Sequence, residues 1–179
     1  MLELHLARSQ LNQLGYMDPN YKIERVEQVR RLYERARWRA KLNRAWSKLR
    51  GQSAGLVDLE TAQANSIITG RYHKRIQTVP IRQIRGSESR SRDFDNRFNP
   101  LQAHTEQRWF NLALALLAGV SLPPVLLIQI GDTYFVRDGH HRISVAQALG
   151  QKEIEAEIIV WEKEKSNVVP SSNSTVCAF

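Results

Sequence analysis

The chain has 179 residues, 42% of them hydrophobic, and a formal net charge of +8. This length fits one domain with a hydrophobic core plus an appendage. The single cysteine, Cys177, excludes a disulfide framework, a cysteine-based metal cluster and a Cys–His catalytic pair, so we expect a protein of the reducing cytoplasm.

The apolar stretches are too interrupted to cross a membrane. The most apolar one, residues 110–130, contains Asn111, Gly119 and the Pro123-Pro124 pair, whereas a spanning helix needs about 20 consecutive apolar residues. The first residues also lack the charged and then apolar order of a signal peptide. We therefore expect a soluble protein.

The positive charge is concentrated in one segment, Lys22–Arg50. This segment holds 11 Lys or Arg and 3 Asp or Glu residues, whereas the 15 basic and 15 acidic residues elsewhere cancel. It contains no Gly or Pro, which predicts a helix with one interruption at most. If its two apolar stripes lie about half a turn apart, the helix either bends between them or packs against protein on two sides. The first stripe is Val26, Val29, Tyr33, Ala36 and Ala40, and the second is Trp38, Leu42, Ala45 and Leu49.

The basic faces of this segment allow three interpretations. The helix could follow nucleic-acid phosphates, with an affinity that falls as salt rises. It could bind an acidic protein or an anionic membrane surface. It could also be a solubilising arm that its tryptophans clamp to the main domain, because Arg and Lys stems often cover apolar surface. The candidate nucleic-acid contacts are Arg30, Arg31, Arg37, Lys41 and Arg44.

Residues 51–84 predict a loop, a helix and a strand. Gly51–Gly55 predicts a flexible break, and Leu59–Thr69 a short helix that ends at Gly70. Gln77–Ile84 predicts a short strand, which Pro80 confines to an edge or an entry position.

The polar loop Gly86–Arg97 is long enough to have a functional role. Its alternating Arg, Ser and Asp residues suit an anion, with or without a divalent ion. Asp93 and Asp95 could offer oxygen ligands to magnesium. A solvated loop with internal ion pairs is the alternative.

Residues 105–136 predict a helix and then a hairpin. Thr105–Ala118 has the apolar periodicity of a helix that ends at Gly119. Val125–Ile130 and Thr133–Val136 are apolar runs separated by Gly131-Asp132, a pattern typical of a hairpin.

A helix and a strand complete the predicted domain. The helix runs from Gly139 to Gly150, with its apolar side chains inward. Glu153–Trp161 alternates acidic and apolar residues, as a strand with one wet face should. From about Ser166 we expect a disordered tail.

The most informative motif joins the hairpin to the last helix. An extended run stops at Asp138-Gly139, and the first helical turn carries His140, His141 and Arg142. The first amides of a helix have no internal partner and add roughly half a positive charge at that end. Arg142 supplies a charged planar fork and the histidines titrate near neutrality, so the motif indicates phosphate binding or phosphate chemistry. Alternatively, Asp138 caps the helix and the His-His-Arg group is a solvated first turn.

The order of these elements around the Asp138–Arg142 motif resembles the ParB/sulfiredoxin superfamily, and within it the small ParB-like nuclease domain proteins. The resemblance covers about residues 77–161. It implies an α+β fold, a small mixed sheet with flanking helices, preceded here by a basic helical arm. We therefore divide the chain into the arm (1–56), the ParB/sulfiredoxin-like domain (57–165) and the tail (166–179). After Gly150 we expect no partitioning helix-turn-helix.

The resemblance carries over to the motif residue by residue. In partitioning ParB proteins the turn reads Gly-Glu-Arg-Arg and holds the phosphates of cytidine triphosphate; Gly139 and Arg142 match it, whereas His140 and His141 do not. In sulfiredoxins the turn reads Gly-Cys-His-Arg, and His140 stands where the nucleophilic cysteine should be. The resemblance thus implies phosphate binding without either reactive group, although Asp138 could replace the lost acid in magnesium-assisted hydrolysis.

These observations predict a domain that binds a nucleoside triphosphate or another phosphate compound. Hydrolysis and phosphoryl transfer are the candidate reactions, Mg²⁺ is a candidate cofactor, and no metal cluster of the protein's own is expected. Replacing Arg142 by alanine should abolish nucleotide binding and leave thermal unfolding nearly unchanged. The candidate acid/base residues are His140, His141 and Asp138, and the candidate phosphate ligands are Gly139, His140, His141 and Arg142, with Gly86, Ser87 and Arg90 closing over them.

Three alternatives belong to other functional classes. A non-catalytic DNA- or RNA-binding module would use the basic arm. A ParB-like nuclease would need an acidic cluster that holds two metals near the scissile phosphate, which this sequence lacks. A scaffold would pack Trp38 and Trp46 onto a partner protein or a second copy of the chain.

Overall fold

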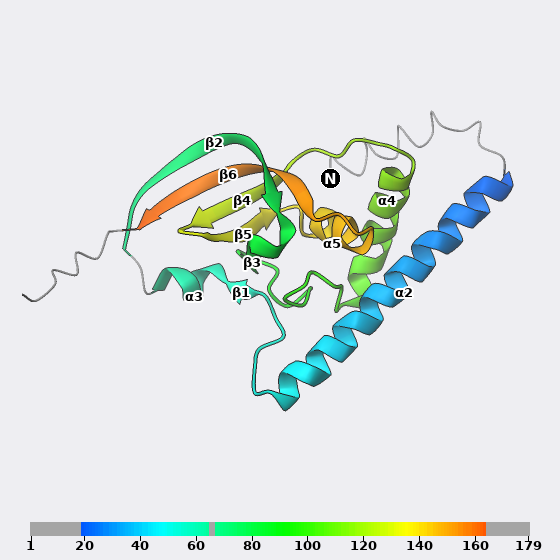
Figure 1. The fold of residues 1–179 in the computed structure, drawn as a ribbon, viewed down its shortest axis with the longest axis horizontal. Helices are drawn as coiled ribbons and strands as arrows, with labels where there is room; N and C mark the ends of the chain where they lie inside the picture. The colour runs from blue at the N-terminus through cyan, green and yellow to red at the C-terminus, as the bar shows by residue number, and fades with distance from the viewer. Residues whose placement is uncertain (1–18, 65–66, 164–179) are drawn as a thin grey trace, which may run out of the picture.

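The computed structural model describes residues 19–64 and 67–163 (Figure 1). They form a mixed six-stranded sheet covered by helices, with one long helix on the outside. The elements in chain order are α2 (Pro19–Leu49), β1 (Val57–Asp58), α3 (Leu59–Ala64), β2 (Ile68–Pro80), the 3-10 turn η1 (Ile81–Gln83), β3 (Ile84–Ser87), the 3-10 turn η2 (Ala103–Thr105), α4 (Glu106–Leu117), β4 (Val125–Ile130), β5 (Thr133–Asp138), α5 (His140–Ala148) and β6 (Glu153–Lys163).

The sheet has the strand order β1-β3-β5-β4-β6-β2. The pairs β4–β5 and β2–β6 are antiparallel, and the pairs β1–β3, β3–β5 and β4–β6 are parallel. The predicted hairpin is confirmed by β4 and β5, which Gly131 joins with a left-handed φ of +60°. The predicted α+β class with a small mixed sheet is confirmed as well.

The two faces of the sheet bury different side chains. On one face Leu127 and Ile158 pack with Ile143 of α5. Their chain neighbours Ile128 and Ile159 point to the opposite face, as the twofold alternation of strands requires, and pack with side chains that include the start of α3. The sheet is therefore covered on both sides, and α5 is held against its centre.

Helix α2 is continuous over 31 residues and packs on one side only. Val29 and Tyr33 are buried against Trp109 of α4, whose ring centroid is 5.2 Å from that of Tyr33. The second stripe is exposed, with Trp38 62% and Leu42 54% accessible, and Trp46 beside it is 59% accessible. The predicted bend or second packed side is therefore wrong, and so is the clamp by tryptophans: Tyr33 fastens the helix. No helix within residues 19–64 and 67–163 combines the length and apolar character needed to cross a bilayer.

The predictions for residues 59–87 need correction. Helix α3 ends at Ala64, and Thr69 and Gly70 lie in strand β2. The predicted strand Gln77–Ile84 is the end of β2, the turn η1 and the first residue of β3. The pairing of the thirteen-residue strand β2 with β6 outweighs the weak helical signal, because tertiary context overrides local propensity. Pro80 is the last residue of this edge strand, where its position was predicted.

Candidate anion site at the start of helix α5

The turn from β5 into α5 depends on one glycine. Gly139 has φ +99°, in the left-handed region, and a Cβ there would lie 2.6 Å from Cγ1 of Val125. Both the backbone and the space therefore require glycine. No side chain caps the helix, so the alternative in which Asp138 caps it is wrong.

Arg142 is buried in this turn and bonded to the protein itself. Its side chain is 4% exposed and donates to the carbonyl oxygens of Pro123 (2.5 Å) and Pro124 (2.7 Å) and to the Asp138 carboxylate (2.6 Å). These bonds fasten the segment before β4 to the start of α5. The structure thus gives Arg142 a positioning role. Arg142 also lines the cavity at this turn, and its predicted contact with a phosphate stays a prediction.

His140 is neutral and bonded to Ser87. The Ser87 hydroxyl oxygen accepts hydrogen bonds from the amides of Ser89 (3.2 Å) and Arg90 (2.8 Å). It therefore donates its own proton to Nε2 of His140, 2.7 Å away. Burial, followed by the positive charge of Arg90, lowers the pKa of His140 from 6.5 to about 4. Ser87 orients the imidazole instead of facing a ligand.

His141 is equally buried but differently bonded. Its Nε2 has no hydrogen-bond partner among the described residues, and its ring meets Phe94 edge-on at 5.2 Å. Burial, then the charges of Arg108 and Arg90, lowers the pKa of His141 from 6.5 to about 4. A buried polar atom without a partner is unusual in a folded protein, so Nε2 of His141 is a candidate contact for a ligand.

Arg90 and Arg108 complete the site. They line a cavity of about 30 Å³ together with Leu112 and residues 138–142. Arg90 was predicted, because it lies in the loop that follows β3. Arg108 was missed, because no local pattern connects a residue of α4 to the start of α5. Gly86 does not line the cavity; a Cβ there would lie 2.3 Å from the Phe135 ring, so its role is packing.

The two aspartates of the loop do not converge on the cavity. Asp93 lies 3.5 Å from both Arg90 and His104. Asp95 is fully buried, and its oxygens accept from the Arg97 and Asn99 amides (2.9 and 2.8 Å). Within the described ranges no three His, Cys, Asp or Glu side chains are grouped to hold a metal. The hydrogen bonds of Asp95 to the protein do not favour the predicted magnesium ligands, which stay a prediction.

A comparison with protein families identifies the domain. The model of the ParB N-terminal domain matches residues 68–172, more than half of the chain. The chain belongs to the ParB N-terminal domain family. The predicted superfamily is thereby confirmed. Among solved structures, the chain is similar to sulfiredoxin from Arabidopsis thaliana, at 22% identity and a TM-score of 0.39, over 50% of this chain and 89% of that one. No curated protein matches.

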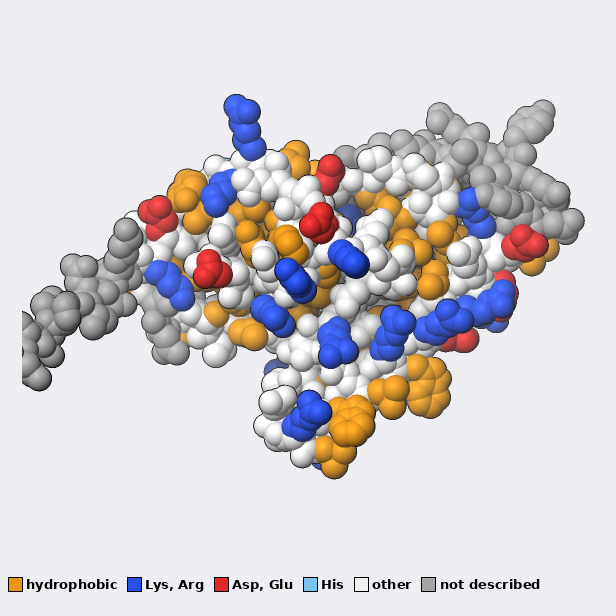
Figure 2. Space-filling view, in the orientation of Figure 1, with side chains coloured by type: hydrophobic (Ala, Val, Ile, Leu, Met, Phe, Trp, Pro, Cys, Tyr) orange, Lys and Arg blue, Asp and Glu red, His pale blue; other side chains and the backbone are white. Residues whose placement is uncertain are grey.

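The ParB-family match begins at β2 and leaves α2 outside it. Of the predicted nucleic-acid contacts on α2, Arg37 is half-buried, with its guanidinium 6.0 Å from the Tyr33 ring centre. The others are exposed, and Lys and Arg side chains form a row along α2 in Figure 2. This row is separate from the cavity at α5. The exposed members are Arg30, Arg31, Lys41 and Arg44.

Proposed function

We propose that this ParB-family domain binds one phosphate group of a larger ligand at the start of α5, with Arg90 and Arg108 as the cationic contacts. The observation that carries the proposal is the buried Nε2 of His141, which has no partner among the described residues and lines the same cavity as both arginines. The first bond within α5 runs from the Ile143 amide to the Gly139 carbonyl (3.0 Å), so the amides of residues 140–142 precede the helical ladder. Such amides and the helix dipole favour an anion.

The size of the cavity limits what enters it. About 30 Å³ is room for little more than one water-sized group. A phosphate would enter only if Arg90 moved outward, which its 42% exposed side chain permits. The terminal phosphate of a nucleotide or another phosphate ester fits this description, and the organic part of the ligand would remain outside.

His141 is a better acid/base candidate than His140. Nε2 of His140 is already bonded to Ser87, whereas Nε2 of His141 has no partner in the described part of the chain. A bound phosphate would add negative charge beside His141 and would raise the pKa of His141 toward neutrality. Protonated His141 could then donate to a phosphate oxygen in hydrolysis or phosphoryl transfer. Asp138 is paired with Arg142 and positions the turn. Magnesium would enter the site bound to the phosphate ligand.

Calorimetry with inorganic phosphate and with a nucleoside triphosphate tests the proposal. Titrations at about pH 6 in two buffers of different ionisation enthalpy should show proton uptake, because the ligand raises a histidine pKa. Arg90→Ala should weaken binding about tenfold, whereas Arg92→Ala, an exposed neighbour in the same loop, should change it about twofold at most. His141→Gln should remove the proton uptake. Absence of heat with both ligands, or equal losses in the two arginine variants, would overturn the proposal.

A second candidate function is nucleic-acid binding by α2. The observation that favours it is the exposed row of cations along α2 (Figure 2). The same helix exposes Trp38 and Trp46, and the Lys41 ammonium lies 5.3 Å from the Trp38 ring centre. Cations contact phosphates and release counterions, while indole rings stack on unpaired bases. The double variant Arg30→Ala/Lys41→Ala should lose retention of a single-stranded oligonucleotide in a gel shift. Arg75→Ala/Arg92→Ala removes the same charge elsewhere and should keep it, so equal losses would reduce the effect to net charge.

A further inference from the structure

A second cavity lies at the other end of α5, where the helix gives way to β6. Its volume is about 630 Å³, within the range of about 300–1,000 Å³ typical of small-molecule sites. Four segments that are distant in the sequence form its walls: the end of β2 with η1 and the start of β3, the loop at 96–98, the end of α5, and the loop into β6. The lining residues are Pro80, Ile81, Arg82, Ile84, Arg85, Asn96, Arg97, Phe98, Gln147, Gln151, Lys152 and Glu153.

The charged side chains of this cavity are unbalanced. Arg82, Arg85, Arg97 and Lys152 oppose one carboxylate, that of Glu153. Within residues 19–64 and 67–163 none of the four cations takes part in an ion pair. Like charges gathered from separate segments repel one another unless an anion lies between them. The cavity is therefore complementary to a ligand with several negative charges.

The loop that carries Arg97 is preorganised by hydrogen bonds within the protein. Its buried neighbour Asp95 is bonded to the side-chain amides of Asn43 (2.9 Å) and Asn99 (3.0 Å) and to the Arg97 backbone amide (2.9 Å). These donors satisfy the carboxylate, so the guanidinium of Arg97 is left to line the cavity. Phe98 adopts a left-handed φ of +53°, which is strained for a bulky side chain and persists only where the surroundings dictate it.

We propose that this cavity binds an organic oligophosphate, that is, a molecule with two or more linked phosphates on an organic body. Guanidinium groups match phosphate oxygens in bidentate fashion, and three of them with one ammonium exceed what a single phosphate can satisfy. Gln147, Gln151 and Asn96 offer amide donors and acceptors for the polar edge of the organic body. This site is separate from the one at the start of α5, and no residue lines both.

The same chemistry could come from a free nucleotide or from the phosphates of a nucleic-acid chain, and the proposal commits to the free molecule. The full chain is titrated calorimetrically with a nucleoside triphosphate, with inorganic triphosphate and with a short single-stranded oligonucleotide. We expect the nucleoside triphosphate to bind best. Arg82→Ala/Arg85→Ala and Arg97→Ala should each weaken its binding about tenfold or more, because each removes charge-assisted bonds.

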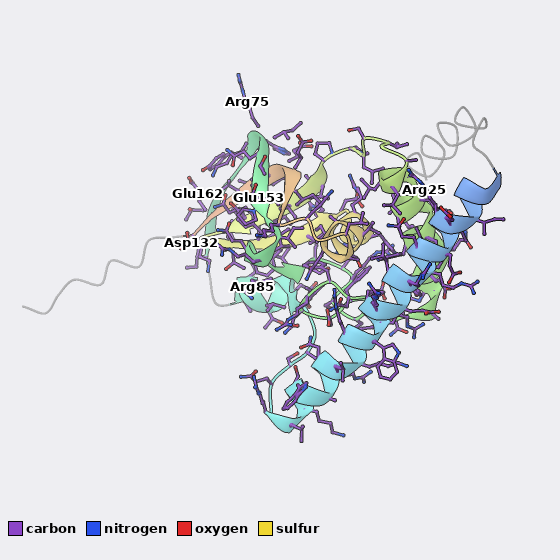
Figure 3. The ribbon with its side chains drawn as sticks, turned by 45° about the vertical axis from the view of Figure 1, so that its right-hand side comes forward. Arg25, Arg75, Arg85, Asp132, Glu153 and Glu162 are labelled. Atoms are coloured by element: carbon purple, nitrogen blue, oxygen red, sulfur yellow. The ribbon has the colours of Figure 1, made fainter. Side chains whose placement is uncertain are left out.

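Two control variants separate this site from others. Arg75→Ala removes the same charge from β2, where the side chain projects away from the body of the molecule and far from Arg85 in Figure 3. Arg90→Ala removes a cation from the site at the start of α5. In both variants, binding at this cavity, followed by the side-chain amide resonances of Gln147 and Gln151, should stay within about twofold, although Arg90→Ala weakens the separate phosphate site at the start of α5. All variants should melt like the wild type, because exposed arginines contribute little to stability.

The possible outcomes are distinct. The proposal is supported if the side-chain amide resonances of Gln147 and Gln151 shift when nucleoside triphosphate is added to the wild type, and if only the cavity variants lose affinity by this readout. It is overturned if no oligophosphate binds, if Arg75→Ala loses as much, or if only Arg90→Ala loses binding. Inorganic triphosphate binding as tightly as the nucleoside triphosphate would refute recognition of the organic body. Preference for the oligonucleotide at equal phosphate concentration would refute a free molecule as the ligand.

Discussion

The two ends of helix α5 use their polar side chains in opposite ways. At its start, Arg142 is 4% exposed and held by two carbonyls and a carboxylate, and His140 is held by Ser87. At its far end, Arg82 and Arg85 line an open cavity and take part in no ion pair that the described residues form. Burying a polar group is costly unless it is hydrogen-bonded, so the polar groups at the buried start of α5 bond to the protein and stabilise its structure. The exposed end leaves its groups available to a ligand.

Arg142→Ala gives the largest expected difference between the two ends. Removing a buried guanidinium deprives the carbonyls of Pro123 and Pro124 of their donor, and we expect the free energy of unfolding to fall by about 4 kcal/mol. Arg85→Ala, at the other end, should change it by less than about 0.5 kcal/mol. Urea denaturation measures both. This replaces the prediction made from the motif, in which Arg142→Ala left stability unchanged; similar midpoints for the two variants would restore it.

Acid should destabilise the start of α5 and not its far end. The pKa of His140 and of His141 is about 4 in the folded protein, against 6.5 ordinarily. Between these values the unfolded chain binds more protons, so stability present above pH 6.5 is lost as the pH falls toward 4, by about 3 kcal/mol per histidine. Urea denaturation at intermediate pH values measures the loss. His141→Gln should flatten the slope relative to the wild type, whereas Arg82→Ala should leave it unchanged; an identical slope in His141→Gln would contradict the assignment.

Asn43→Ala should loosen the loop at the far end of α5 and lower the free energy of unfolding moderately. The Asn43 side chain donates to the carboxylate of Asp95 (2.9 Å) and to the amide oxygen of Asn96 (2.7 Å). Asp95 keeps its other donors, so we expect a loss of about 1 kcal/mol. Hydrogen exchange should rise at Phe98 and Asn99 and stay unchanged at the start of α5. Asn111→Ala, on α4, is the control. Equal rates of hydrogen exchange at Phe98 and Asn99 in both variants would show that the Asn43 hydrogen bonds do not hold this loop.

Trp38→Ala should have the smallest effect. This side chain is 62% exposed, so its replacement should alter the free energy of unfolding by less than about 0.5 kcal/mol. Val29→Ala, on the buried face of the same helix, should cost about 2 kcal/mol by leaving a cavity. Thermal unfolding distinguishes the two. A marked loss in Trp38→Ala would show that the outer face of α2 is covered in solution.

Elements with strong local signals could be predicted from the sequence. The glycines at 119, 131, 139 and 150 have left-handed φ values at the ends of α4, the hairpin and α5, which is where the periodicity stops. The elements before residue 87 were predicted less well, because β2 owes its length to β6, more than seventy residues away in the sequence (Ile68 pairs with Lys163). Pairing over such a distance leaves no short-range pattern.

The location of the site could be predicted from the sequence, but the role of each residue could not. The loop after β3 and the start of α5 do meet, through Ser87 and His140, which lie 53 positions apart in the sequence. The motif could not reveal that carbonyls of Pro123 and Pro124 would occupy Arg142, because any arginine near a helix start looks equally available. Nor could it point to Arg108, which reaches the cavity from α4.

The hydrogen bond from Asn43 to Asp95 connects the outer helix α2 to the wall of the larger cavity. Asn43 belongs to α2, and its partner Asp95 fixes the wall from which Arg97 extends. A partner molecule that displaces α2 would release that wall. By thermodynamic reciprocity, a ligand in the larger cavity would change the affinity of α2 for that partner by the same factor. The side chain of Asn43 would then couple two distant binding surfaces.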